Sequence, residues 1–175
     1  LKLVKVIDTH IHADHISALN ELNKRTNCIR VMGEKSKSEV IDLRIKDGEK
    51  IKVEEVELQA IYTPGHTDCS YSFLMNDRVF TGDTLLINGS GRTDFQNGNA
   101  YDAYDSIFNK LLKLPEKTLV FPAHDYNGKK FSTIENEKNN NPRLQVSSKE
   151  EYADIMNNLN LANPKMMDVA VPANV

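Results

Sequence analysis

The sequence predicts an α/β fold, with strands and helices in mixed order along a chain of 175 residues. Two observations support this class. Short apolar runs of strand length are interspersed with segments whose apolar residues recur at helical spacing. Polar clusters rich in histidine and aspartate follow the ends of several predicted strands. The length suits one core, and no repeat or low-complexity linker divides it, so residues 1–175 are expected to form a single domain.

The N-terminal part is predicted to run strand, helix, strand. Residues 3–7 form an apolar run that ends at polar residues, as a buried strand does. Ile16 begins a series of apolar residues at helical spacing, which predicts a helix that ends near Asn27. Residues 28–32 are again apolar enough for a buried strand.

Turn signals in the middle of the chain predict two hairpins. The Lys-Asp-Gly-Glu stretch at 46–49 indicates a tight turn with strand-like sequence on either side. Residues 53–62 are predicted to form one long strand. Residues 71–75 and 78–81 flank an Asn-Asp pair and form the second predicted hairpin.

The C-terminal half is predicted to be mainly helical. Apolar residues over 103–114 recur at helical spacing, and Pro115 ends that helix. Residues 118–121 form a short strand. Residues 132–139 and 148–159 are expected to form closing helices.

The bulk composition is ordinary for a globular protein and argues against some classes of partner. Apolar residues make up 39% and charged residues 27%, and the net charge of −3 is spread along the chain. We therefore expect no nucleic-acid partner and no membrane association. The two cysteines, Cys28 and Cys69, are too few for a disulfide framework and are expected to be reduced. We expect a cytoplasmic location and, from the abundance of Lys and Asn, a bacterial source.

Histidine is concentrated in one short motif. Three of the five histidines lie within residues 10–15, and the other two lie in strand-end loops. Neutral imidazole and carboxylate are the ligands that borderline divalent metals prefer. Without a metal, the protonation of so many clustered rings would destabilise the fold. The residues expected to form a metal site are His10, His12, Asp14, His15, His66, Asp83 and His124.

Two of these residues have simpler explanations when each is taken alone. His124 by itself would be a surface histidine, and Asp14 by itself would be a helix N-cap. The joint pattern favours the metal site over both.

The order of these motifs resembles a known metal signature. The motifs are His10-x-His12-x-Asp14-His15, Gly65-His66-Thr67, Gly82-Asp83 and His124. Together they resemble the metallo-β-lactamase superfamily over nearly the whole chain. The resemblance implies an αββα sandwich with the metal site at one edge of two facing sheets. In that family several strands precede the first histidine motif, whereas here about one does. The chain is therefore expected to be truncated at its N-terminus and to lack strands of the first sheet.

Further stretches resemble one subfamily, the persulfide dioxygenases, also called sulfur dioxygenases or ethylmalonic-encephalopathy-type proteins. These stretches are residues 80–87 (FTGDTLLI), 91–96 (GRTDFQ), 122–126 (PAHDY) and 141–144 (NPRL), together with the tail at 158–161 (NLNL) and 171–174 (VPAN). The resemblance implies an enzyme that oxidises glutathione persulfide, or a similar small persulfide, with O2 to sulfite and thiol in sulfide detoxification.

The resemblance also implies a ligand set. One non-haem Fe(II) per chain would be held by His10, His66 and Asp83, with positions open for sulfur and dioxygen. The remaining polar residues would orient these ligands or line a second site: His12, Asp14, His15, His124 and Asp125. Asp125 is expected to accept from a ligand or a loop amide. In dinuclear zinc relatives the same residues complete two metal positions, and the sequence leaves that filling open.

Three residues are candidates for binding the substrate: Arg92, Tyr126 and Arg143. Guanidinium suits a peptide carboxylate, and a phenol can donate to a carbonyl or thiolate. The alternatives are an ion pair with Asp94 for Arg92 and a helix-end contact for Arg143.

Two sulfur features have simpler explanations than a role in the chemistry. Cys69 is expected to be a packed thiol rather than a persulfide carrier. The adjacent residues Met166 and Met167 are expected to fill the core.

Two rival functions follow from the same residues. The nearest is a glyoxalase II-like hydroxyacylglutathione thioester hydrolase with two metals and a bridging hydroxide. Such hydrolases usually have a Lys-Phe-Tyr-type stretch where this chain has residues 92–95, and a longer helical C-terminal region. The other is a metal-binding module without enzyme activity. A rhodanese sulfurtransferase partner and a homodimer are compatible with the resemblance, and the identity of the thiol carrier stays open.

Overall fold

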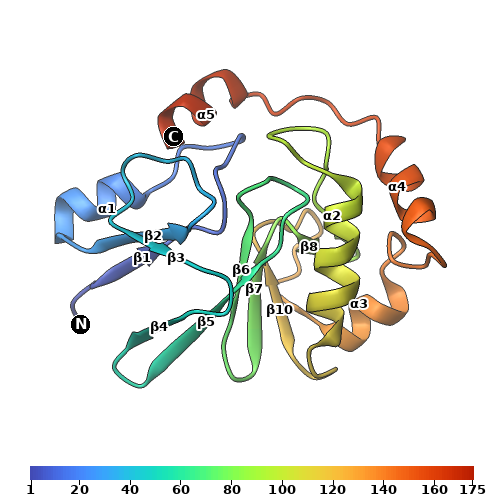
Figure 1. The fold of residues 1–175 in the computed structure, drawn as a ribbon, viewed down its shortest axis with the longest axis horizontal. Coiled ribbons are helices and arrows are strands. Elements are labelled where there is room, and N and C mark those ends of the chain that lie inside the picture. The colour runs from blue at the N-terminus through green and yellow to red at the C-terminus, as the bar shows by residue number, and fades with distance from the viewer.

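Two β-sheets face each other in the structure, a computed structural model that describes residues 1–175 (Figure 1). In chain order the strands are β1 (Lys5–Ile7), β2 (Ile29–Gly33), β3 (Leu43–Ile45), β4 (Lys50–Val53), β5 (Val56–Tyr62), β6 (Tyr71–Leu74), β7 (Arg78–Gly82), β8 (Leu85–Leu86), β9 (Gly89–Ser90), β10 (Leu119–Pro122) and β11 (Ser132–Thr133). The first sheet has the order β1-β2-β3, the second has the order β11-β10-β7-β6-β5-β4, and β8 and β9 form a separate hairpin.

Helices cover the outer faces of both sheets. They are α1 (Leu19–Thr26), α2 (Ala100–Tyr104), α3 (Ile134–Asn140), α4 (Lys149–Asn157) and α5 (Met167–Asn174), and α2 continues through a π-helical turn η1 (Asp105–Lys110) and a 3₁₀ turn η2 (Leu111–Lys113). In Figure 1, α1 and α5 lie on the side of the first sheet, and α2, α3 and α4 lie on the side of the second. The order helix, sheet, sheet, helix confirms the predicted αββα sandwich.

Three apolar clusters correspond to the three interfaces between these layers. The largest joins the second sheet to the helices outside it and includes Val79, Val120, Ile107 and Tyr152. A second lies between the sheets and includes Val31, Ala60, Tyr71 and Phe73. A third lies between α1 and the first sheet and consists of Ile11, Leu19, Met32 and Cys69. Burial of these faces is the main driving force for the layered arrangement.

Strand directions bring several loops to one edge. Strands β5 and β7 are both antiparallel to β6, so they run the same way, and β10 is parallel to β7. The carboxyl ends of β5, β7 and β10 therefore lie along the same edge of the second sheet. The carboxyl end of β1, in the facing sheet, meets the same edge.

Most of the predicted elements are confirmed, and the helix after the histidine motif is confirmed in part. Helix α1 ends at Thr26 and is followed by the C-cap residue Asn27, whose φ of 56° lies in the left-handed region. Its first residue is Leu19, so the expectation that Ile16 belongs to this helix is wrong. Ile16 lies in the preceding loop and is 54% exposed.

The prediction of a hairpin at 46–49 is wrong. Strand β3 pairs in parallel with β2, whereas β4 pairs antiparallel with β5. The turn therefore carries the chain from one sheet to the other. The predicted long strand 53–62 is also wrong at its start, because Glu54, with φ 52°, turns the chain between β4 and β5.

Several parts of the chain after β7 differ from the prediction. Residues 132–139 begin with the short strand β11 before α3 starts. The helix expected over 103–114 starts earlier, where the Asn99 side chain caps the amides of Tyr101 and Asp102. Helix α5 and the β8–β9 hairpin were not predicted. Met166, expected in the core, is 45% exposed.

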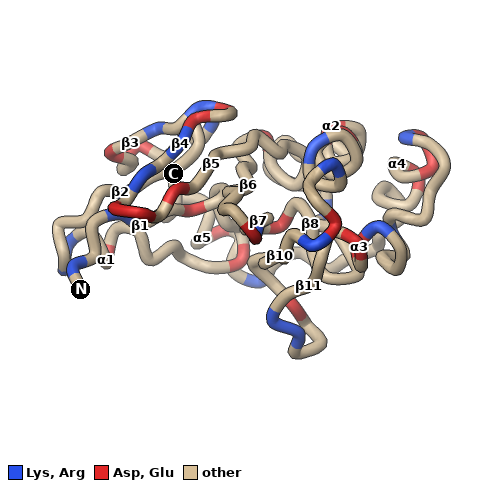
Figure 2. The backbone as a smooth tube through the Cα atoms, turned by 90° about the horizontal axis from the view of Figure 1, so that it is seen from below, with Lys and Arg blue, Asp and Glu red and all other residues tan.

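Basic and acidic residues are both spread along the chain (Figure 2). None of the helices combines the length and the apolar character needed to cross a bilayer. Strand β1 forms one edge of the first sheet. Close to it an open apolar groove of about 300 Å³ is lined by Ile7, Thr9, Leu58, Phe73, Phe80, Gly82, Phe121, Pro122 and Ala123.

Candidate metal centre

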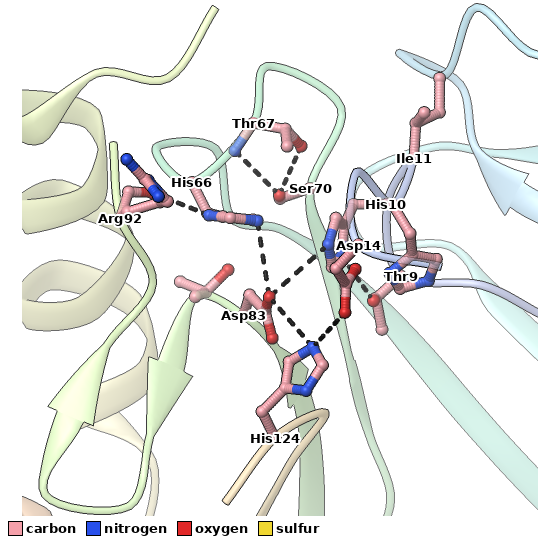
Figure 3. Close-up of polar contacts among 12 residues, drawn as sticks. Thr9, His10, Ile11, Asp14, His66, Thr67, Ser70, Asp83, Arg92 and His124 are labelled. Atoms are coloured by element: carbon pink, nitrogen blue, oxygen red, sulfur yellow. Dashed lines mark hydrogen bonds and ion pairs between the residues drawn. The ribbon is translucent and has the colours of Figure 1, made fainter. Parts of the chain in front are cut away.

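Four loops bring the predicted metal residues together. His10 follows β1, His66 follows β5, Asp83 follows β7, and His124 follows β10. Figure 3 shows the side chains of these residues pointing toward one another from separate loops. The convergence expected from the strand ends is confirmed.

One group consists of His10, His66 and Asp83, whose ligand atoms all lie within 4.8 Å of one another. The Nε2 atoms of His10 and His66 lie 4.0 and 3.5 Å from Asp83 Oδ2. These distances are too long for hydrogen bonds. The second carboxylate oxygen of Asp83, Oδ1, is buried and has no hydrogen-bond partner. Two imidazoles and a carboxylate arranged in this way fit a cation that all three side chains share.

Neighbouring groups leave the Nε2 atoms of both histidines available as ligands. The Nδ1–H of His66 donates to the carbonyl oxygen of Arg92 at 2.8 Å, since a carbonyl can only accept. Nδ1 of His10 lies 2.9 Å from Thr9 Oγ1. Contacts of this kind fix the tautomer and the ring orientation of metal-binding histidines.

His10 is held in its neutral form. Burial lowers the pKa of His10 well below its ordinary value, and the nearby rings of His12, His66, His124 and His15 lower it further. A neutral imidazole keeps the nitrogen lone pair that a metal needs.

A second group lies beside the first and consists of His12, Asp14 and His15. His124 lies between the two groups, with Nε2 3.3 Å from Asp14 Oδ2 and 3.6 Å from Asp83 Oδ2. Asp14 does not cap α1, because the N-cap position is Ala18. The structure therefore brings together all seven residues that the sequence singled out.

The loop of the first histidine motif is held from behind by a residue that sequence reasoning missed. Asn174, at the end of α5, hydrogen-bonds through its side chain to the backbone of His12, His15 and Ser17. Its position in the family-like stretch at 171–174 was the only sequence signal for it.

A cavity of about 490 Å³ opens onto the metal residues. It is lined by Ala13, Asp14, His66, Asp83, Leu86, Ser90, Gly91, Arg92, His124, Tyr126, Arg143, Leu161, Ala162 and Pro164. The lining includes all three predicted substrate-binding residues. A cavity of this size is in the usual range for a small-molecule site.

Arg143 presents a half-buried guanidinium to this cavity. It donates a hydrogen bond to the carbonyl of Ser90 and forms no ion pair. Burial lowers the pKa of Arg143, but a guanidinium stays charged in proteins. The helix-end contact considered for Arg143 is not formed, because Gln145 donates to the carbonyls of Lys138 and Asn141 instead. A buried cation without a carboxylate partner suits an anionic ligand.

Arg92 is engaged by the protein itself. It forms a bidentate ion pair with Asp94, at 2.7 Å for each bond, which is the alternative considered from the sequence. It also donates to the carbonyls of Leu161 and Ala162 at 3.3 and 2.7 Å, and its guanidinium lies over the Phe95 ring. Arg92 therefore ties the segment between α4 and α5 to the wall of the cavity.

Tyr126 and Asp125 lie in the loop after β10. The Tyr126 ring is exposed and parallel to the ring of His124, with the centroids 6.1 Å apart. Asp125 Oδ2 accepts from the backbone amides of Asn127 and Lys129 at 2.9 and 2.6 Å. Asp125 thus bonds to loop amides, as expected, and shapes the loop that carries Tyr126.

Cys69 is a packed thiol. It is 2% exposed and lies in the apolar cluster beneath the first histidine motif. Its sulfur accepts from the amide of Ile11 at 3.4 Å. Burial raises the pKa of Cys69, so the reactive thiolate is disfavoured.

Comparison with known proteins places the chain among metal-dependent enzymes. The model of the metallo-beta-lactamase superfamily matches residues 31–124, which include His66, Asp83 and His124. The mitochondrial persulfide dioxygenase ETHE1 of Mus musculus is 44% identical over 178 residues, covering 100% of this chain and 69% of the mouse protein. The crystal structure of ETHE1 from Myxococcus xanthus superposes with a TM-score of 0.97 at 49% identity, covering 99% of this chain and 77% of that one.

Thioester hydrolases are more distant. The hydroxyacylglutathione hydrolase of Buchnera aphidicola is 36% identical over 126 residues, covering 71% of this chain and 49% of the hydrolase. The similarity to the dioxygenases is higher and spans the whole chain, including the C-terminal segment that carries Asn174.

Proposed function

This chain belongs to the persulfide dioxygenase family of the metallo-β-lactamase superfamily, and on that premise we propose that it uses one iron(II) ion to oxidise a glutathione-type persulfide. It is an enzyme of the persulfide dioxygenase type. The balanced reaction is RSSH + O2 + H2O → RSH + SO3²⁻ + 2H⁺. The sulfane sulfur supplies all the electrons, so no reducing cosubstrate is required.

The observation that carries the proposal is the group His10, His66 and Asp83, of which His66 and Asp83 line the cavity. Two neutral imidazoles and one carboxylate are the donor set of non-haem iron(II) oxygenases, in which three positions stay open. The iron would supply one centre that binds the persulfide sulfur and dioxygen side by side. The orphaned Oδ1 of Asp83 supports a cation there, because a buried carboxylate oxygen needs a partner.

Arg143 and Tyr126 would hold the substrate. The guanidinium of Arg143 is half buried and unpaired by any carboxylate, which suits a peptide carboxylate of the thiol carrier. The pKa of Tyr126 is raised by desolvation and by the carboxylates of Asp83 and Asp14, so its phenol stays a hydrogen-bond donor. Both side chains line the cavity that opens onto the metal ligands.

Arg92 would act through the cavity wall. Its pairing with Asp94 and with two backbone carbonyls leaves little capacity for a substrate carboxylate. We therefore propose that Arg92 contributes to substrate binding by fixing Leu161 and Ala162, which line one side of the cavity. His12, Asp14, His15 and His124 would set the charge and the shape of its metal-facing end.

The second group of candidate ligands is the reason to test the dinuclear hydrolase as an alternative function. His12, Asp14 and His15 lie close enough to hold a second ion, as a dinuclear hydrolase would require.

Both sheets contribute candidate ligands to a single centre, which supports the proposal that residues 1–175 act as one domain. The cytoplasmic location, the bacterial source, a rhodanese partner and a homodimer stay predictions.

Anaerobic metal analysis followed by oxygen uptake tests the function. The purified protein, loaded with ferrous ion, is expected to retain one iron per chain, to consume O2 when glutathione persulfide is added, and to release sulfite. Two zinc ions per chain together with cleavage of S-lactoylglutathione would establish the hydrolase instead. Metal binding without either reaction would identify a non-enzymatic module.

A further inference from the structure

A buried carboxylate lies behind the wall of the cavity. Glu137 of α3 is fully buried, and its four partners are all neutral groups. Its Oε2 accepts from the amide of Asn88 at 2.9 Å and from the side chain of Asn141 at 2.8 Å. Its Oε1 accepts from the hydroxyl of Ser132 and from the side chain of Asn136. Burial of a carboxylate is costly unless such donors surround it, so this arrangement calls for an explanation beyond stability.

The network holds the β8–β9 hairpin at three consecutive residues. The amide of Asn88 donates to the buried carboxylate. The carbonyl of Gly89 accepts from the side chain of Asn141 at 2.9 Å. The carbonyl of Ser90 accepts from the guanidinium of Arg143.

The same segment continues to the metal ligands. A Cβ atom on Gly91 would lie 2.0 Å from the carbonyl oxygen of Asp83 and 3.0 Å from Cγ of His66, so the backbone packs directly under both. The next carbonyl, that of Arg92, accepts from His66 Nδ1. Residues 88–92 thus run from the buried carboxylate to a ligand of the proposed metal.

Asn141 also fixes the start of Arg143. Its Oδ1 accepts from the backbone amide of Arg143 at 3.1 Å, while its Nδ2 bonds to Gly89 and Glu137. One fully buried side chain therefore sets both the backbone from which the arginine extends and the strand that its guanidinium contacts.

We propose that Glu137 and Asn141 are positioning residues of the persulfide reaction, which fix residues 88–92 and thereby orient Arg143 toward the substrate. The inference rests on the proposed function. Neither residue lines the cavity, so each acts through the backbone of the hairpin and through Arg143.

Asn141→Ser and Glu137→Gln test the proposal. Serine is too short to reach Gly89, and the amide of glutamine places a donor where the carboxylate accepts. Both variants are expected to raise the KM for glutathione persulfide and the calorimetric Kd of glutathione itself by about 10-fold, because a misplaced Arg143 would lose its charge-assisted hydrogen bond to the ligand. We expect kcat to fall by less than KM rises. The Kd of glutathione is measured without turnover.

Two control variants separate positioning from stability. Thr133→Ala removes the side-chain cap of α3 and leaves all four partners of the Glu137 carboxylate in place, and Glu135→Gln removes a charge from an exposed position of α3. Thr133→Ala is expected to lower Tm and leave KM and Kd unchanged. Glu135→Gln is expected to change none of these quantities.

The outcomes are distinct. Equal rises in KM and Kd for Thr133→Ala and Asn141→Ser would show that the network acts through stability alone and would overturn the inference. Unchanged KM and Kd in Asn141→Ser would also overturn it. If Glu137→Gln does not fold, Asn141→Ser decides alone, because it keeps the carboxylate. A parent protein that neither binds glutathione nor consumes O2 with its persulfide would instead refute the proposed function.

Discussion

The side-chain amide of Asn174 donates a hydrogen bond to the backbone carbonyl of His12 at 3.0 Å, across 162 positions of the chain. The same nitrogen donates to the carbonyl of His15 at 2.8 Å, and the Asn174 oxygen accepts from the amide of Ser17 at 2.8 Å. The last helix thus holds the loop that carries the first histidine motif. The C-terminal segment therefore contributes to the site, although it supplies no predicted ligand.

Asn174→Ala should loosen this loop. Three hydrogen bonds are lost, and buried carbonyls are left without a donor, so the free energy of unfolding should fall by about 2–3 kcal/mol. The affinity for ferrous ion should fall by about 10-fold. Urea unfolding and anaerobic metal titration measure the two effects. Asn160→Ala, at an exposed position between α4 and α5, is the matched control. Unchanged metal affinity in Asn174→Ala would show that α5 does not support metal binding.

Asp83→Asn should abolish iron binding. The amide keeps the size of the side chain but removes the charge that the two imidazoles face. Elemental analysis of the purified variant should find no bound iron, and sulfite production should be lost. Asp77→Asn, at an exposed ion pair with Arg78, removes the same charge elsewhere and should retain both. Iron retained at the level of the parent would contradict the ligand assignment.

Arg143→Met should weaken substrate binding. A charge-assisted hydrogen bond contributes about 1.5–3 kcal/mol, so the KM for glutathione persulfide should rise by about 10- to 100-fold. Arg143→Lys keeps the charge but loses the planar fork, and should recover only part of the affinity. Arg78→Met, which removes a guanidinium paired with Asp77, should leave KM unchanged. Steady-state oxygen uptake provides each KM. An unchanged KM in Arg143→Met would show that this arginine does not bind the substrate.

Cys69 should not take part in the chemistry. Burial is the main cause that raises the pKa of its thiol above the ordinary value of 9.0. Because the folded pKa is raised, the contribution of the protonated thiol to stability is complete below pH 9 and is lost as the pH rises through the folded pKa. Native protein should resist alkylation by iodoacetamide at neutral pH, and unfolded protein should react. Mass spectrometry during turnover should find no persulfide on Cys69, and a turnover-dependent adduct there would reverse this assignment.

The histidine motif illustrates what sequence reasoning can and cannot supply. Residues 10–15 could be identified as candidate ligands because few side chains bind divalent metals, and imidazole and carboxylate groups can be recognised from the sequence alone. Strand ends could be placed because apolar runs stop where polar loops start. The turn at 46–49 could not be assigned correctly, because a local turn signal is the same whether the next strand returns to its own sheet or crosses to the facing one.

Glu137 and Asn174 were missed for a related reason. Glutamate and asparagine are common on helix surfaces, and nothing in their neighbours indicates that these two are buried. Their roles depend on hydrogen bonds to Asn88 and to His12, which are distant in sequence.

The sequence by itself determined the α/β class, the seven candidate metal residues and the subfamily, because these depend on residue type and order. The tertiary structure alone decided which of these side chains lie close enough to share one ion, that Arg92 is paired with Asp94, and that Arg143 is free of any carboxylate. The physical reason is that ligand geometry, burial and pairing depend on distances between segments, and these distances are fixed only when the layers pack.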